Sequence, residues 1–239
     1  MLKVFISGLE KQSGKTIIAA GLAATMQSLS YSTTVYKPIQ TNASMLHGFK
    51  TSPDLTVIKK FDPNISTDST YVLQGSAPPF VSSYEDKIKI EMNTIYNDYL
   101  NADKMSDCLI VEGANSISVP ILEHCTEIDI VKTLNLPLIL VINTKKTPIE
   151  RVLTGISYIQ SNHCRLLGVI LNQYDEDSQN LEEKYYPQIL KEFVPVNILG
   201  TIPDYDKIST FSPELLIADI LNRVDIEQIF GVKIAKLNS

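Results

Sequence analysis

The 239-residue sequence has few of the features that mark secreted or membrane proteins. Its three cysteines, Cys108, Cys125 and Cys164, are an odd number at wide spacings. They indicate small apolar side chains in a reducing compartment rather than a disulfide framework. No apolar run approaches the ~20 residues that a membrane-spanning helix needs. Because no signal-peptide pattern precedes the first apolar run, we expect a cytoplasmic protein without a membrane partner.

Basic residues are not concentrated in any segment either. The formal net charge is −6, and the 21 lysines and arginines are scattered along the chain. A nucleic-acid surface needs clustered positive charge, so we expect no nucleic-acid partner. The sequence also lacks repeats, low-complexity tracts and linkers. Its length suits one α/β domain over residues 1–239, with a short helical tail from about residue 212.

The chain does contain a phosphate-binding loop at residues 8–16, which fits the pattern G-x-x-x-x-G-K-[ST]. Glycines in this pattern let backbone N–H groups turn toward phosphate oxygens. Lys15 would reach the β- and γ-phosphates, and the Thr16 hydroxyl would ligate Mg²⁺. An apolar run over 2–7 precedes the loop, and a helical pattern follows it. The segment predicts nucleoside triphosphate binding through Gly8, Lys11, Gln12, Ser13, Gly14, Lys15 and Thr16.

The rest of the chain alternates apolar runs with helical patterns. Nearly continuous apolar runs are typical of buried strands in a parallel sheet, and they lie at 32–38, 107–112, 137–143, 167–172 and 196–201. Helices are predicted from about 52, and over 89–99, 127–134, 148–161 and 178–193. Residues 39–51 and most of 62–83 are predicted to be loop. The predicted fold class is α/β, with a doubly wound, mostly parallel sheet and helices on both faces.

In such a sheet, ligands bind beyond the carboxyl ends of the strands. Glu112, at one such end, either faces a metal ion or simply enters solvent. Lys37 either reaches an anionic ligand or stays solvated. Asn172 either recognises adenine or opens a turn. Asp54, after the probable start of a helix, is either a second magnesium-side carboxylate or an ordinary first-turn acid.

Several segments occur in the order and with the spacing of one known family. They are Gly8…Gly14-Lys15-Thr16, Tyr36-Lys37-Pro38-Ile39-Gln40-Thr41, Asp54, Val111-Glu112-Gly113-Ala114, Val119-Pro120, Gly168-Val169-Ile170-Leu171-Asn172 and Gly200-Thr201-Ile202-Pro203. Together they resemble the dethiobiotin synthetases, P-loop enzymes that are the ATP-dependent carboxylases of biotin synthesis. The resemblance extends from residue 2 to about residue 206.

The resemblance implies a reaction of 7,8-diaminononanoate with carbon dioxide and MgATP. It implies that Lys15 holds the phosphates and that Lys37 stabilises a carbamate and the transferring phosphoryl group. The implied magnesium ligands are Thr16, Asp54 and Glu112, the implied adenine contacts are Asn172 and Pro203, and Thr41 would contact substrate. The family is a homodimer in which the partner subunit completes the substrate site, which would give Asn143 and Lys145 a role there.

The chain departs from the family pattern mainly on the substrate side. Lys11 and Ser13 replace a threonine and a valine, and Asn115 and Ser116 replace two glycines that lie against the diamine. Phe80 ends a segment, Pro78-Pro79-Phe80, that is Ser-Pro-His in the family. These differences fit either a divergent dethiobiotin synthetase or a relative with another substrate.

Other functions remain open at this point. An amidoligase of the cobyrinate synthase type shares the fold, but the usual glutaminase domain is missing. A non-catalytic, ATP-dependent dimeric switch would carry a lysine where this chain has Glu10. A nucleotide-sensing domain without catalysis is the remaining alternative.

Overall fold

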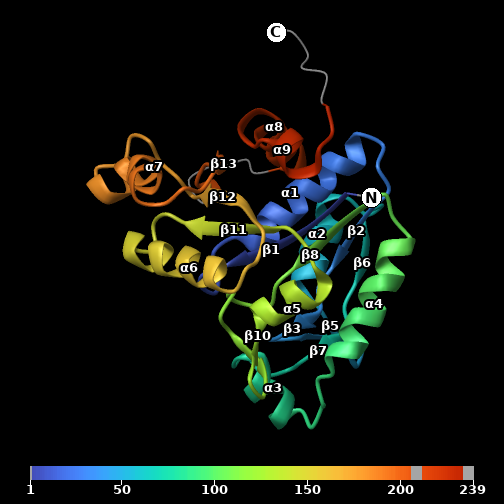
Figure 1. Cartoon of the computed structure of the whole chain (residues 1–239). Coiled ribbons are helices and arrows are strands. Elements are labelled where there is room, and N and C mark those ends of the chain that lie inside the picture. The colour runs from blue at the N-terminus through green and yellow to red at the C-terminus, as the bar shows by residue number, and fades with distance from the viewer. Residues whose placement is uncertain (1, 206–211, 234–239) are drawn as a thin grey trace.

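Seven parallel strands form the central sheet of the computed structural model, which describes residues 2–205 and 212–233 (Figure 1). The strand order is β13-β12-β11-β1-β8-β2-β6. The bounds are β1 Leu2–Gly8, β2 Thr33–Tyr36, β6 Ser66–Asp68, β8 Cys108–Glu112, β11 Leu138–Asn143, β12 Leu166–Asn172 and β13 Ile198–Ile202. The predicted α/β class with a doubly wound sheet is confirmed.

The strand order creates a crevice between β1 and β8. The connection after β1 leads to β2 on one side, whereas the connection after β8 leads to β11 on the other. Loops that leave neighbouring strands in opposite directions open a space beyond the carboxyl ends of those strands. The loops after Gly8 and Glu112 therefore lie along one edge of the sheet, together with the residue that follows Tyr36.

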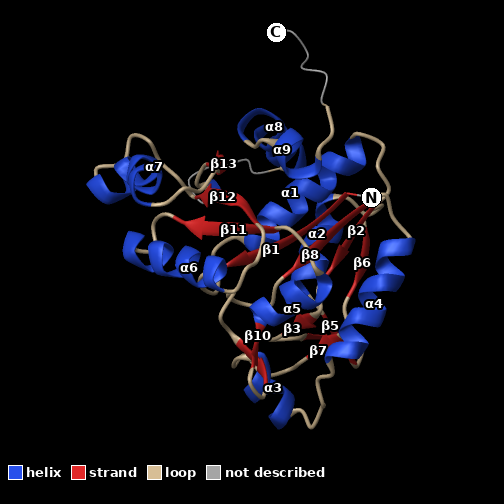
Figure 2. Cartoon of the chain, in the orientation of Figure 1, coloured by secondary structure: helices blue, strands red, loops and turns tan. Residues whose placement is uncertain are grey.

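Helices cover both faces of the sheet (Figure 2), and alternate residues of the strands contribute to two apolar layers, one on each face. In β1, Phe5 belongs to one layer, and Val4 and Ile6 belong to the other. The first layer includes α4 Met92–Lys104, α5 Glu127–Leu134, α6 Ile149–Ser161 and α7 Leu181–Phe193. The second includes α1 Lys15–Ser28, α2 Pro53–Phe61, α8 Pro213–Arg223 and α9 Ile226–Phe230. Burial on both faces explains why the strand sequences are apolar throughout.

The two segments predicted to be loops contain short elements. Strands β3 Ile39–Gln40 and β7 Tyr71–Val72 pair, β6 forms an edge of the main sheet, and α3 spans Pro79–Glu85. Strands β4 Ser44–Leu46 and β5 Phe49–Thr51 form an exposed hairpin whose turn residues, His47 and Gly48, both have positive φ. A second hairpin, β9 Pro120–Leu122 with β10 Cys125–Thr126, was also not predicted. These elements are held by backbone pairing, so the sequence shows no apolar period there.

The predicted helices agree with the structure except at the start of α7, which begins at Leu181 rather than near residue 178, and in α4. It begins at Met92 and continues to Lys104, so the predicted range of 89–99 is early at both ends. The predicted tail contains α8 and α9, and α8 packs against α1. In the described residues, no helix is long and apolar enough to cross a membrane. The cysteines are all free, and burial raises the pKa of the Cys108 thiol to about 12, while Cys125 and Cys164 are half-buried.

The contact between α8 and α1 predicts a stability effect. Ile220 is fully buried beside Gly21, where an added Cβ would lie 2.8 Å from Ile220 Cγ1. We expect Ile220→Ala to lower the free energy of unfolding by about 2–5 kcal/mol, because it leaves a cavity in the core. The neighbouring Leu221 is 40% exposed, so Leu221→Ala should cost about 1 kcal/mol or less. Urea denaturation measures both variants. Equal losses of unfolding free energy in Ile220→Ala and Leu221→Ala would contradict this packing.

Candidate active site

The phosphate-binding loop is shaped by two glycines and held by a residue from another strand. A Cβ at Gly8 would lie 2.3 Å from Ser13 Oγ, so a side chain there would displace the loop. Gly14 has φ 96°, and a Cβ there would lie 2.0 Å from Asn172 Nδ2. Asn172, at the end of β12, donates from Nδ2 to the Ser13 carbonyl at 3.0 Å. Asn172 thus fixes the loop, a role the adenine prediction did not include.

The N-terminus of α1, which follows this loop directly, has no side-chain cap. Helix α1 has neither a side-chain cap nor an acidic residue in its first turn. By contrast, Ser52 caps α2 and Asp54 lies in the first turn of that helix. Uncapped N–H groups at a helix N-terminus, together with the helix dipole, form a binding site for anions. The loop and α1 therefore have the geometry that a nucleotide phosphate requires.

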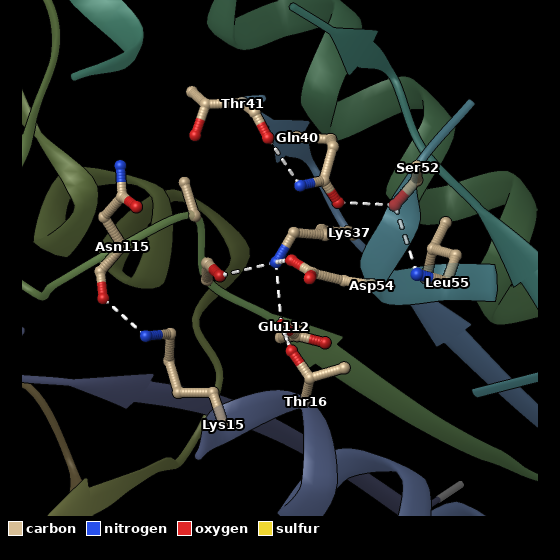
Figure 3. Close-up of polar contacts among 12 residues, drawn as sticks. Lys15, Thr16, Lys37, Gln40, Thr41, Ser52, Asp54, Leu55, Glu112 and Asn115 are labelled. Carbon is tan, nitrogen blue, oxygen red and sulfur yellow. Dashed lines mark hydrogen bonds and ion pairs between the residues drawn. The ribbon is translucent and has the colours of Figure 1, made fainter. Parts of the chain in front are cut away.

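Lys15 is buried at the base of this loop. Its Nζ donates to the Asn115 carbonyl at 2.5 Å and to the Glu10 carbonyl at 3.2 Å (Figure 3 shows the first contact). Burial lowers the pKa of Lys15, because the protein replaces the water that would stabilise its charge. A phosphate placed against the loop would restore the stabilisation of that charge.

Lys37 is fully buried between two carboxylates, as Figure 3 shows. Its Nζ lies 2.7 Å from Glu112 Oε1 and 2.8 Å from Asp54 Oδ2, and it donates to the Gly113 carbonyl at 3.1 Å. Burial acts to lower the pKa of Lys37, but the two carboxylates outweigh it and raise that pKa. The pKa of Asp54 is lowered, because Lys37 outweighs the effect of burial. Lys37 is therefore a fixed cation behind Asp54 and Glu112, which themselves line the cavity described below.

Glu112 links the two lysine-bearing segments and has a free oxygen. Its Oε1 accepts from Thr16 Oγ1 at 2.7 Å as well as from Lys37. Its Oε2 is buried and has no hydrogen-bond partner. A buried carboxylate oxygen without a partner is costly unless a ligand satisfies it.

A cavity of about 470 Å³ connects these groups. Its walls include Lys15, Asp54, Glu112 and Thr41. Asn115 also lines it, and the Asn115 amide nitrogen is buried without a hydrogen-bond partner. At another part of the wall, Lys11 Nζ donates to the Ser76 carbonyl, which connects the loop to the segment before α3. The cavity therefore combines a phosphate loop, two carboxylates and unused hydrogen-bonding capacity.

Comparison with known proteins places this geometry in a family. The family model described as AAA domain matches residues 3–212. The ATP-dependent dethiobiotin synthetase BioD of Bacillus subtilis (strain 168) is 25% identical over 218 residues, covering 91% of this chain and 94% of that protein. The protein of the same name from Fusobacterium nucleatum is 30% identical over 173 residues, covering 71% and 78%. The chain belongs to the ATP-dependent dethiobiotin synthetase family. It is an ATP-dependent ligase.

Solved structures show the same fold at low sequence identity. A ParA family ATPase from Chlorobium tepidum TLS has a TM-score of 0.56 and 18% identity, covering 92% of this chain and 96% of that one. A MinC:MinD cell division protein complex from Aquifex aeolicus has a TM-score of 0.59 and 12% identity, covering 100% and 99%. These likenesses concern the fold alone.

Most of the residues predicted for the site lie together around the cavity of this dethiobiotin synthetase family member. Residues that line the cavity are Lys11, Gln12, Gly14, Lys15, Thr16, Thr41, Asp54, Glu112 and Asn115. Gln40 also lines it and was not predicted, although it stands in the quoted Lys-Pro-x-Gln-Thr segment. Gln40 Nε2 donates to the Thr41 carbonyl at 2.7 Å, and Ser52 Oγ donates to Gln40 Oε1 at 2.5 Å. Gln40 therefore holds Thr41 against the start of α2.

Other predicted residues lie outside the cavity lining, among them Lys37, Gly8 and Asn172. Asn143 donates from Nδ2 to Gln173 Oε1 at 2.6 Å, and its Oδ1 accepts from the Lys145 backbone N–H at 3.0 Å. The Lys145 ammonium pairs with Asp204. Pro203 follows β13, and Ser116 is half-buried in the loop after β8. Ser13, in the phosphate-binding loop, is fully buried. The adenine and substrate roles of these residues stay predictions.

The family assignment and the loop geometry predict how Lys15 acts. We expect Lys15→Ala to weaken ATP binding by about 100-fold or more, because charge-assisted hydrogen bonds to two phosphates are lost. Calorimetric titration with ATP measures this directly. Lys146→Ala, an exposed lysine in the loop after β11, is the matched control and should bind ATP normally. Unchanged affinity in Lys15→Ala would contradict the phosphate-loop assignment.

Proposed function

We propose that this enzyme is a dethiobiotin synthetase, which converts 7,8-diaminononanoate, carbon dioxide and ATP into dethiobiotin, ADP and phosphate. The observation that carries the proposal is the buried Lys37 ammonium, fixed by Asp54 and Glu112 beside the phosphate loop. A fixed cation at this position suits a reaction in which negative charge develops next to the γ-phosphate. The names of the relatives support the same reaction.

The proposed chemistry needs no protein nucleophile. One substrate amine adds to carbon dioxide and loses a proton, which gives a carbamate. A carbamate oxygen attacks the γ-phosphorus and ADP leaves, and the second amine then attacks the carbamoyl carbon and displaces phosphate to close the cyclic urea. Lys15 and Lys37 stabilise the anionic oxygens, and positioning supplies the rest of the rate enhancement. Thr41, which Gln40 orients, contacts the substrate in this proposal.

Magnesium is part of the proposal, and the residues present fit it. Glu112 Oε2 is buried without a partner, and Asp54 and the Thr16 hydroxyl supply further oxygens. In the described residues, no group of three or more histidines, cysteines and carboxylates could hold a metal ion by itself. Two carboxylates and a hydroxyl nevertheless suit Mg²⁺, which usually takes its remaining ligands from water and phosphate. When bound, the ion neutralises charge on the phosphates.

The proposal also assigns a place to the residues outside the cavity. We propose a cytoplasmic homodimer in which Asn143 and Lys145 lie near the partner subunit's substrate site. This would account for polar residues that end β11 without lining the cavity of their own chain. Pro203 and Asn172 would border the adenine.

Glu10 argues against the dimeric switch. In that alternative, a lysine at this position would serve the nucleotide. Here the Glu10 carboxylate accepts from Thr147 Oγ1 at 2.6 Å and lies 3.7 Å from Arg151, on α6. The side chain is therefore engaged with α6, and nothing at this position supplies a cation. The contacts of Glu10 therefore favour an enzyme over an ATP-dependent dimeric switch.

The proposed reaction predicts strict dependence of ATP hydrolysis on both substrates. We expect phosphate release only when diaminononanoate, bicarbonate as the source of carbon dioxide, and Mg²⁺ are all present. Mass spectrometry should detect dethiobiotin in equal amount to the phosphate released. Reactions that lack one component at a time are the controls. Normal ATP binding without any dethiobiotin would overturn the proposed substrate and leave the family assignment intact.

Lys37 should affect turnover more than ATP binding. We expect Lys37→Met to lower kcat by about 10²–10³-fold, as does removal of one donor that stabilises a developing anion. ATP affinity should stay within about threefold, because Lys15 and the loop still hold the phosphates. Lys50→Met is the control, since Lys50 is an exposed lysine paired with Asp86 at 2.6 Å. An undiminished rate in Lys37→Met would remove Lys37 from the catalytic groups.

A further inference from the structure

Glu127 is a fully buried carboxylate that the proposed chemistry does not use. It is the first residue of α5 and lies behind the loop that follows β8, on the side away from the cavity. Its Oε1 accepts from Ser7 Oγ at 2.5 Å, and its Oε2 accepts from the backbone N–H groups of Ala114 at 2.6 Å and Asn115 at 3.3 Å. A buried acid with three donors has a defined position, because loss of any partner would leave a polar atom unsatisfied.

These hydrogen bonds orient the peptide between Gly113 and Ala114. A trans peptide is planar, and its N–H and C=O point in opposite directions. The Ala114 N–H points at Glu127, so the Gly113 carbonyl points the other way, where it accepts from Lys37 Nζ at 3.1 Å. Glu127 therefore determines one of the three contacts that hold the Lys37 ammonium.

The same carboxylate also supports Lys15. The Asn115 N–H donates to Glu127, and the Asn115 carbonyl accepts from Lys15 Nζ at 2.5 Å. Ser7, the third partner, immediately precedes Gly8 in β1, so the carboxylate also connects the start of the phosphate loop to the loop after β8.

Gly113 shows that the space is reserved for this carboxylate. A Cβ at Gly113 would lie 2.2 Å from Glu127 Oε1 and 2.6 Å from Cδ. Any other residue at this position would displace the acid or the loop. The absence of a side chain at Gly113 and the presence of the acid at Glu127 are thus parts of one arrangement.

We propose that Glu127 is a positioning residue that sets both active-site lysines through the peptide segment 113–115. It touches neither nucleotide nor substrate. Its effect on Lys15 requires only ATP binding, and its effect on Lys37 during turnover rests on the proposed function. The two effects therefore need separate readouts.

The test is Glu127→Gln compared with Asp129→Asn. Glutamine keeps the size of the side chain, but its NH₂ group cannot accept from the donors that now meet the carboxylate. We expect ATP affinity, measured by calorimetry without other substrates, to fall about tenfold, and kcat for dethiobiotin formation to fall at least tenfold. Asp129, in the same helical turn, accepts from the Thr126 N–H at 2.8 Å and pairs with Lys132 at 2.7 Å, and neither partner lines the cavity. Asp129→Asn should lower thermal stability while leaving ATP affinity and kcat within about twofold.

Several outcomes would overturn the proposal. Folded Glu127→Gln protein with ATP affinity and kcat within twofold of the parent would show that the acid only supports α5. Equal losses of ATP affinity and kcat in Glu127→Gln and Asp129→Asn would also show that Glu127 only supports α5. If the parent makes no dethiobiotin, the proposed function fails and ATP affinity alone tests Glu127. If Glu127→Gln does not fold, Ser7→Ala removes one of the three donors and should lower ATP affinity about threefold; no change would contradict the proposal.

Discussion

The buried Lys37 ammonium is the interaction on which the arrangement of the site depends. It connects the end of β2 to Glu112 at the end of β8 and to Asp54 in the first turn of α2. A lysine without partners at this depth would lose its proton or destabilise the fold, because burial of an isolated charge costs several kcal/mol. Two carboxylates keep it charged, and it keeps them charged in turn.

The loops that surround the site are held by two residues outside the cavity lining. Asn172 fixes the phosphate loop from β12, and Glu127 fixes the loop after β8 from α5. In the described residues, five buried side-chain polar atoms have no hydrogen-bond partner, and two of them, Glu112 Oε2 and the Asn115 amide nitrogen, belong to residues that line the cavity. These two atoms are the hydrogen-bonding capacity that a bound ligand could use. Fixed loops beside such atoms are typical of a preorganised site.

The sequence predicted the parts of the fold that depend on burial. The apolar runs that form β1, β8, β11 and β12 are covered on both faces, so their apolar composition indicates buried strands of a parallel sheet. The hairpin β4–β5 and the edge strand β6 were not predicted, because these strands are only three residues long and are held by backbone hydrogen bonds rather than by burial. The helix α4 was placed too early, since nothing in residues 89–91 marks a helix start.

The sequence predicted those site residues that lie at or near the ends of strands. Lys37, Asp54 and Glu112 meet as the parallel topology requires, because neighbouring strands end at one edge of the sheet. Sequence could not show that Asn172 donates to the phosphate loop, since β12 and this loop are far apart in the chain. Glu127 escaped notice for a similar reason. It resembles an ordinary acid in the first turn of a helix.

A double-mutant cycle on Lys37 and Glu112 tests the central claim most directly. The free energy of unfolding is measured for the parent, Lys37→Met, Glu112→Gln and the double variant. Each single change should leave a buried charge under-compensated, so we expect a coupling energy between the two sites of at least about 2 kcal/mol. Effects that add within about 0.5 kcal/mol would contradict it, because Lys37 would then not depend on Glu112 for its place in the site.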